Sequence, residues 1–142
     1  MISIIGAGPS GNYLAYLLAK QNKEVQVFED HKVIGVPIQC TGIITPELEN
    51  IIPVKKSFLT NKINQAKIYS PNGNSLHVKF AKEDIIVDRT KFDTHLGEMA
   101  KKAGAKYYLG KRFQENKGKK MKIGEEFIET DILIGADGPF SR

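Results

Sequence analysis

Apolar residues along the chain occur in short continuous runs and in helical spacings, and this alternation is typical of an α/β protein. Residues 2–5 form an apolar run that stops at a glycine, which predicts a buried strand before a tight turn. From Pro9 to about Gln21, apolar residues recur every three or four positions and predict a helix. Residues 24–28 predict a second strand. The apolar positions expected on the helix face are Tyr13, Leu14, Leu17 and Leu18, with the smaller Ala15 and Ala19 beside them.

The middle of the chain has a less regular pattern. Between Asp30 and Asp84, glycines and prolines interrupt the periodic runs, so we expect mainly loop with one short helix near 46–51. Strands over 63–69 and 75–80 flank the turn sequence Pro71-Asn72-Gly73-Asn74. This segment predicts an antiparallel hairpin, because Asn-Gly supplies the positive φ angles that such a turn needs.

The last third predicts a second helix and a return to the sheet. Thr90 and Asp93 resemble a capping box that begins a helix ending near Ala103, and its buried face should contain Phe92, Leu96 and Met99. A strand at 106–109, an antiparallel meander over 112–129 turning at Lys117-Gly118, and a fully buried strand at 132–134 follow. We expect the first 30 residues and strand 132–134 to share one parallel sheet, with the 90–103 helix packed on it.

Two turns in this pattern carry candidate chemistry. Gly6-Ala7-Gly8-Pro9-Ser10-Gly11 matches the G-x-G-x-x-G pattern of dinucleotide sites, in which a strand and a helix flank the glycines and the helix N-terminus faces phosphates. Glu29 ends the next strand, where an acid accepts hydrogen bonds from ribose hydroxyls and its charge repels a 2′-phosphate. An ion pair with Lys32 is the simpler alternative for Glu29. Asp137-Gly138 follows the last strand, at the sheet edge where such folds bind ligands, although Asp-Gly is also common in plain turns.

Composition and charge narrow the class of protein. The 142 residues are 41% hydrophobic and 26% charged, as in one ordinary globular domain, and no apolar run is long enough to span a bilayer, so we expect a cytoplasmic location. The lone Cys40 excludes an internal disulfide framework, and we expect no metal site. The net charge of +5 comes mainly from loop lysines such as Lys117, Lys119 and Lys120 without interleaved aromatic residues. We therefore expect no nucleic acid partner, while contact with an anionic membrane surface stays open.

Three segments in this order resemble the para-hydroxybenzoate hydroxylase-like flavoprotein superfamily. They are residues 6–11 with Glu29, Val87-Asp88-Arg89 leading into Phe92-Asp93-x-x-Leu96, and Ile134-Gly135-Ala136-Asp137-Gly138-x-x-Ser141-Arg142. Within the superfamily, residues 34–42 are similar to the Gly-x-Pro-x-x-Cys-x-Gly segment of geranylgeranyl reductases, including the archaeal digeranylgeranylglycerophospholipid reductases.

The resemblance implies a Rossmann-like FAD-binding domain with a central parallel sheet, a β-meander crossover and a hairpin. Residues 1–142 would be the N-terminal part of this domain, with the hairpin at 63–80 belonging to an incomplete substrate-binding region and the C-terminal half missing. The residues implied to bind FAD are Gly6, Gly8, Pro9, Ser10, Gly11 and Glu29 on its ADP half, and Arg89, Asp137 and Gly138 near its pyrophosphate and ribitol. Cys40 would lie near the isoalloxazine as the catalytic candidate.

The implied activity is FAD-dependent reduction of isoprenoid double bonds in lipid biosynthesis, with NAD(P)H or ferredoxin as electron donor. The alternatives are an FAD-dependent aromatic monooxygenase of the same superfamily and a non-catalytic nucleotide-binding fragment. Two residues also have simpler interpretations. Cys40 would be a small, inert, half-buried side chain, and Arg89 would only pair with Asp88 or Asp93.

Overall fold

The computed structural model describes residues 1–141 and divides the chain into two compact units. The first unit contains Met1–Pro37 and Thr90–Arg142, and the second contains Ile38–Arg89. Arg142, the last residue of the third motif above, lies outside the described residues. Within the described residues, no helix has the length and apolar character needed to cross a membrane.

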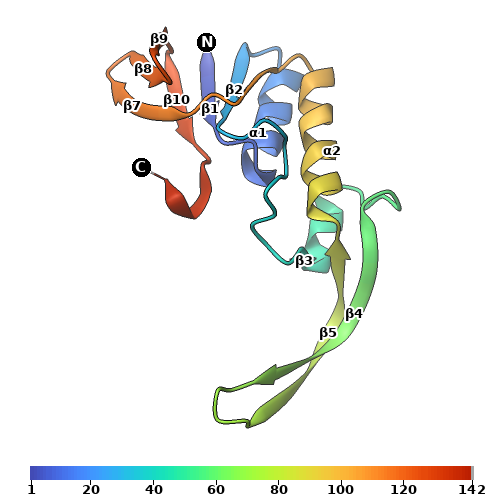
Figure 1. Cartoon of the computed structure of the whole chain (residues 1–142). Coiled ribbons are helices and arrows are strands. Elements are labelled where there is room, and N and C mark those ends of the chain that lie inside the picture. Colours follow the sequence, from blue (N-terminus) through green and yellow to red (C-terminus); the bar gives the residue numbers. More distant parts are fainter. Residues whose placement is uncertain (142) are drawn as a thin grey trace. The chain divides into compact units, whose positions relative to one another are not determined.

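A four-stranded parallel sheet forms the centre of the first unit (Figure 1). Its strands, in spatial order, are β10 (Ile132–Gly135), β1 (Ile2–Ile5), β2 (Val25–Glu29) and β6 (Lys106–Leu109). Every neighbouring pair in this sheet is parallel. The sheet confirms the predicted α/β fold and the expectation that strand 132–134 shares one parallel sheet with the first 30 residues.

Two layers cover the sheet, one on each face. Helices α1 (Pro9–Lys20) and α2 (Arg89–Lys102) cover one face, where Ile4 and Val27 of the sheet share a core with Ala15 and Ala100 of the helices. The predicted antiparallel meander covers the other face, as β7 (Phe113–Lys117), β8 (Lys120–Ile123) and β9 (Glu126–Glu129). Its Met121 and Ile123 pack against Ile5 and Phe28. The unit is therefore a helix, sheet and meander sandwich that buries both faces of β1 and β2.

Helix α1 contacts the sheet through its small residues. Gly11, Ala15 and Ala19 are buried at four-residue spacing, whereas Leu17 is 39% exposed, which corrects the expectation that it lies on the buried face. Small side chains at this spacing let the helix backbone approach the sheet closely. Leu14 and Leu18 are partly buried and pack against the core beside Ala15 and Ala19, so the expected face is confirmed except at Leu17.

Two further expectations need correction. The strand at 132–134 is not fully buried: β10 is an edge strand, and Ile132 is 50% exposed. Helix α2 begins at Arg89, so Thr90 lies inside the helix rather than capping it, and its hydroxyl donates to the carbonyl of Gly35 at 3.0 Å. In both cases the predicted position of the element along the chain is confirmed. Tertiary contacts determine how far β10 is buried and which group Thr90 binds.

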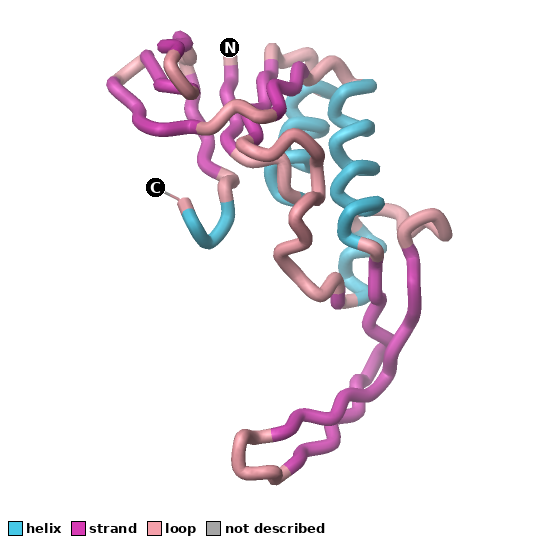
Figure 2. Tube along the Cα trace, viewed as in Figure 1, coloured by secondary structure: helices cyan, strands magenta, loops and turns pink. Residues whose placement is uncertain are grey.

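The second unit is dominated by a long antiparallel ribbon, drawn as the paired strands β4 and β5 (Figure 2). Its elements are β3 (Ile43–Ile44), the short 3-10 helix η1 (Pro46–Asn50), β4 (Leu59–Tyr69) and β5 (Ser75–Val87). The hairpin turns at Gly73, whose φ is +86°, as the Asn-Gly sequence predicts. Both strands extend well beyond the predicted 63–80 range, and β3 adds a short strand beside β5.

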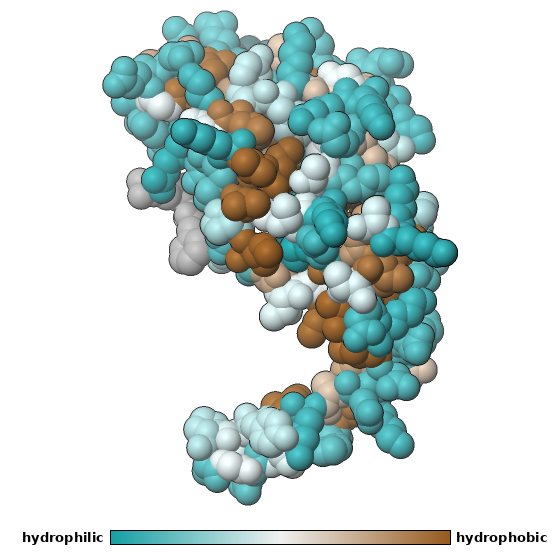
Figure 3. All heavy atoms as spheres, turned by 45° about the vertical axis from the view of Figure 1, so that its right-hand side comes forward, coloured by the Kyte–Doolittle hydropathy of each residue, from teal (hydrophilic) through white to brown (hydrophobic). Residues whose placement is uncertain are grey.

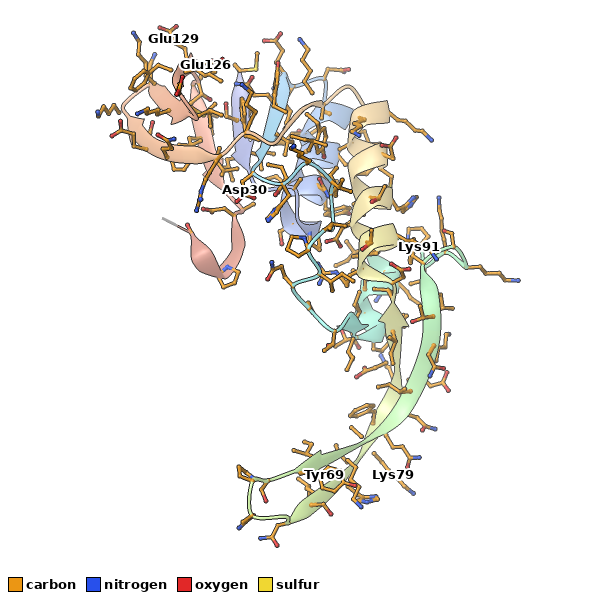
Figure 4. All side chains as sticks on the ribbon, in the orientation of Figure 1. Asp30, Tyr69, Lys79, Lys91, Glu126 and Glu129 are labelled. Atoms are coloured by element: carbon orange, nitrogen blue, oxygen red, sulfur yellow. The ribbon has the colours of Figure 1, made fainter. Side chains whose placement is uncertain are left out.

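The outer part of this ribbon carries an exposed apolar pair. Ile68 and Leu76 face each other across the strands and are 58% and 61% exposed. Apolar atoms are visible among polar ones on the ribbon surface (Figure 3). The side-chain view labels Tyr69 on β4 and Lys79 on β5, both in the outer part of the ribbon (Figure 4). The two side chains of Ile68 and Leu76 therefore leave apolar surface on the outer part of the ribbon.

Candidate functional site

The glycine turn after β1 is shaped by close backbone contacts. Gly6 has a φ of +100°, and a Cβ atom there would collide with the carbonyl oxygen of Ala136 and lie 2.9 Å from the Cα of Asp137. A Cβ on Gly11 would collide with the carbonyl oxygen of Gly6 and lie 3.3 Å from the Cβ of Ala136. These two glycines are therefore required by the fold itself, because any side chain would force backbone segments apart.

Gly8 differs from both of its partners in the motif. Its φ of −74° suits any residue, and a Cβ built on it meets no described atom within 4 Å. Gly8 is also the N-cap of α1, and within the described chain this helix start has neither a side-chain cap nor an acidic residue in its first turn. An open space beside backbone N–H groups at a helix N-terminus fits a phosphate group, so these residues fit the pyrophosphate of a dinucleotide.

A buried amide holds this turn in place. The Nδ2 atom of Asn12 donates to the carbonyls of Ala7 at 2.7 Å and Asp93 at 3.0 Å, and its Oδ1 accepts from the hydroxyl of Tyr107 at 2.8 Å. Burial raises the pKa of Tyr107, so this hydroxyl keeps its proton and remains a donor. No pattern in the sequence points to Tyr107 in β6, and a polar residue such as Asn12 in a helix is equally common on the exposed face.

Glu29 lies at the end of β2 with its carboxylate turned toward the glycine turn. Its Oε2 accepts a hydrogen bond from the N–H of Ala7 at 2.7 Å, and its Oε1 accepts one from the N–H of His31 at 3.0 Å. Burial raises the pKa of Glu29, but hydrogen bonds from Asp30, Ala7 and His31 outweigh it and hold the pKa below its usual value. The hydrogen bond with Glu29 raises the pKa of Asp30. The carboxylate of Glu29 thus stays ionised, and its neighbours are these groups rather than the Lys32 of the simpler alternative.

Asp137 and Gly138 complete the same edge of the sheet. They follow β10 and lead into the short 3-10 helix η2 (Gly138–Phe140), while the N–H of Ala136 donates to the carbonyl of Ile5 at 2.7 Å. Because Gly6 lies against Ala136 and Asp137, the ends of β1, β2 and β10 meet at the glycine turn. The carboxyl edge of a parallel sheet is where open α/β folds bind their ligands.

Cys40 and Arg89 come together within the second unit. The Cys40 side chain is exposed, which contradicts its interpretation as half-buried. A hydrogen bond from the backbone of Gly42 and the nearby charge of Arg89 lower the pKa of the Cys40 thiol. A Cβ on Gly42, whose φ is +80°, would collide with the carbonyl oxygen of Val87, so the loop needs glycine there. The loop therefore presents an exposed thiol whose lowered pKa favours the thiolate form.

This environment predicts the pH dependence of alkylation at Cys40. The rate follows the thiolate fraction, so the midpoint of the rate against pH should lie below that of a model cysteine. Arg89→Gln should move the midpoint to higher pH because a stabilising positive charge is lost, whereas Lys82→Gln, which removes a charge paired with Glu47, should leave it in place. Iodoacetamide labelling followed by mass spectrometry measures the profile, and equal midpoints in all three proteins would contradict the assigned cause.

Comparisons with known proteins agree with this geometry. Residues 4–43 match the NAD(P)-binding Rossmann-like domain family. A digeranylgeranylglycerophospholipid reductase of Methanosarcina acetivorans is 31% identical over 99% of this chain. The crystal structure of a geranylgeranyl bacteriochlorophyll reductase-like protein from Thermoplasma acidophilum superposes with a TM-score of 0.79 at 27% identity, over 96% of this chain. The chain is therefore similar, over nearly its whole length, to proteins named as geranylgeranyl reductases.

The extent of the match differs between relatives. The chain spans 38% of the length of the Methanosarcina acetivorans reductase and 38% of the Thermoplasma acidophilum chain. It spans 83% of an uncharacterized protein in the nifH2 5' region of Methanosarcina barkeri, to which it is 29% identical. Similarity to geranylgeranyl reductases thus covers nearly all of this chain but only about two fifths of those relatives.

Proposed function

We propose that this chain forms the FAD-binding part of an oxidoreductase that reduces double bonds of isoprenoid lipids. The observation that carries the proposal is the open space over Gly8 at the N-terminus of α1, next to a glycine turn that the fold otherwise closes tightly. Glu29 supplies an ionised acceptor at the end of the neighbouring strand. A pyrophosphate and an adenosine ribose need this pair of features.

The proposed roles follow from these positions. The backbone from Gly8 to Gly11, including Pro9 and Ser10, would hold the pyrophosphate, and Glu29 would accept hydrogen bonds from the ribose hydroxyls. Arg89, Asp137 and Gly138 would bind the remainder of the dinucleotide.

The negative charge of Glu29 and Asp30 disfavours a 2′-phosphate, which supports FAD over NADP at this position. When bound, the flavin supplies hydride transfer, the chemistry that protein side chains lack.

The substrate and partners rest on the names of the relatives. A geranylgeranyl lipid is the proposed substrate, with NAD(P)H or ferredoxin as electron donor, and the exposed Cys40 as the candidate group beside the flavin ring. We also propose that the hairpin at 63–80 belongs to a substrate-binding region. The exposed Ile68 and Leu76 pair supports this, because an isoprenoid chain needs an apolar wall. Peripheral contact with an anionic membrane is consistent with the net charge of +5 and with such a substrate.

Calorimetric titration of the chain with FAD and with NADP tests the nucleotide assignment. FAD should bind measurably and NADP should bind at least about tenfold more weakly, since a 2′-phosphate would face the two carboxylates. Equal affinity for the two nucleotides, or no binding of either, would refute the assignment. Reduction of a geranylgeranyl lipid with dithionite-reduced FAD tests the activity separately.

A non-catalytic nucleotide-binding protein is the second candidate. It is favoured by the Methanosarcina barkeri relative, most of whose length this chain covers. Under this candidate the chain would bind FAD in the titration and show no turnover of the lipid. The two assays together therefore distinguish a nucleotide-binding protein from a reductase.

A further inference from the structure

The imidazole ring of His31 lies beside the carboxylate of Glu29. Its Nδ1 atom is 2.6 Å from Oε1 of Glu29 and 2.8 Å from Oδ1 of Asp30. The carbonyl of His31 accepts a hydrogen bond from the N–H of Gly110 at 2.9 Å, and the carbonyl of Glu29 accepts one from Lys111 at 2.8 Å. The backbone around His31 is therefore tied to the loop after β6, while its ring remains 44% exposed.

We propose that His31 is a positioning residue of the nucleotide site, which holds the Glu29 carboxylate in the orientation that receives the ribose hydroxyls. This inference rests on the proposed function, because it assigns a second residue to the same site. The sequence suggested no role for His31, although it is only two residues beyond Glu29.

The geometry gives the physical reason. Glu29 is only 12% exposed, and its two oxygens are held from different sides: Oε2 by the N–H of Ala7 and Oε1 by His31. Nδ1 of His31 faces two carboxylate oxygens, so the tautomer with a proton on Nδ1 donates to this acidic pair. Without the ring, Glu29 and Asp30 would lose the side-chain nitrogen that lies 2.6 Å from an oxygen of the first and 2.8 Å from an oxygen of the second. Their repulsion would then turn Glu29 away from the ribose position.

The half-exposed ring argues against a role in core packing. A histidine kept only for packing would be buried among apolar side chains, whereas the polar edge of this ring meets two acids. Its backbone hydrogen bonds do not require a particular side chain and would persist in a variant. Removing the ring should therefore affect the carboxylate more than the fold.

Two substitutions separate the donor from the ring. His31→Asn places an amide nitrogen where Nδ1 lies and keeps the donor, while His31→Leu fills the space without one. Binding of ADP and of 2′,3′-dideoxy-ADP is measured by NMR titration of the full chain, and thermal unfolding reports stability. His31→Leu should weaken ADP binding roughly tenfold, leave dideoxy-ADP binding unchanged, and be rescued to within about twofold by His31→Asn.

The other outcomes contradict either this inference alone or the proposed function together with it. If wild-type protein binds no ADP, both the proposed function and this inference fail. If wild-type protein binds ADP but His31→Leu weakens both ligands equally, or neither, or His31→Asn gives no rescue, the inference alone is overturned. His31→Ala serves as a second donor-free variant should His31→Leu unfold at a lower temperature than wild type.

Discussion

Gly8→Val is expected to abolish nucleotide binding while the protein keeps its fold. A Cβ at Gly8 meets no described atom and its φ of −74° suits valine, so the protein itself tolerates the change. The proposed pyrophosphate would occupy the same space, and a branched side chain there should weaken FAD binding by about a hundredfold or more. Valine is a poorer N-cap than glycine, which should cost at most about 1 kcal/mol of stability. Calorimetry with FAD and thermal unfolding measure the two effects.

Gly8→Ala provides the graded control. A single methyl group enters the same space, so its effect on FAD binding should lie between those of wild type and valine. Unchanged FAD affinity in the valine variant would place the nucleotide elsewhere. A large loss of stability in the alanine variant would instead show that Gly8 is required by the fold.

The parts of the fold that could be predicted depend on local patterns. The run Ile2–Ile5 and the turn from Gly6 to Gly11 specify a strand, a turn and a helix through residues adjacent in sequence. The hairpin followed from Asn72-Gly73 for the same reason. The meander was predicted from its turn at Lys117-Gly118, and its β7 and β8 flank that turn. Residues adjacent in sequence are therefore sufficient to predict these elements.

Burial within those elements depends on distant contacts and could not be predicted. Ile132 is as apolar as Ile4, yet it is half exposed because β10 lies at the sheet edge. Leu17 is exposed because the small Ala15 and Ala19 face the sheet instead. No pattern in the chain distinguishes an edge strand from a central one when both are apolar.

The candidate site also contains some residues that the sequence predicts and others that only the structure identifies. Gly6, Gly11 and Glu29 were predicted by a motif with a fixed spacing, and the structure brings them to one sheet edge. Asn12 and His31 became visible only through contacts that the fold creates. The bond from Asn12 to Asp93 joins residues 81 positions apart, a separation at which a single sequence contains no pairing information.

Gly11→Ala is expected to destabilise the protein by roughly 3 kcal/mol, lowering its melting temperature by about 10 °C. On an open helix surface the same change stabilises by about 0.5 to 1 kcal/mol, because alanine has the higher helix propensity and restricts the unfolded chain. Here the sign reverses, since the added Cβ would collide with the carbonyl oxygen of Gly6 and crowd the Cβ of Ala136 at 3.3 Å. Both neighbours belong to the closely packed turn and cannot rotate away as a flexible side chain would.

Thermal unfolding without nucleotide isolates this effect from binding, and Gly8→Ala is the matched control on the same helix end. That control should unfold within about 1 kcal/mol of wild type, because its Cβ enters open space. A Gly11→Ala protein as stable as wild type would mean that α1 can shift away from the sheet. The helix N-terminus would then not be held where the pyrophosphate requires it, and the assignment of the glycine turn as a nucleotide site would lose its structural basis.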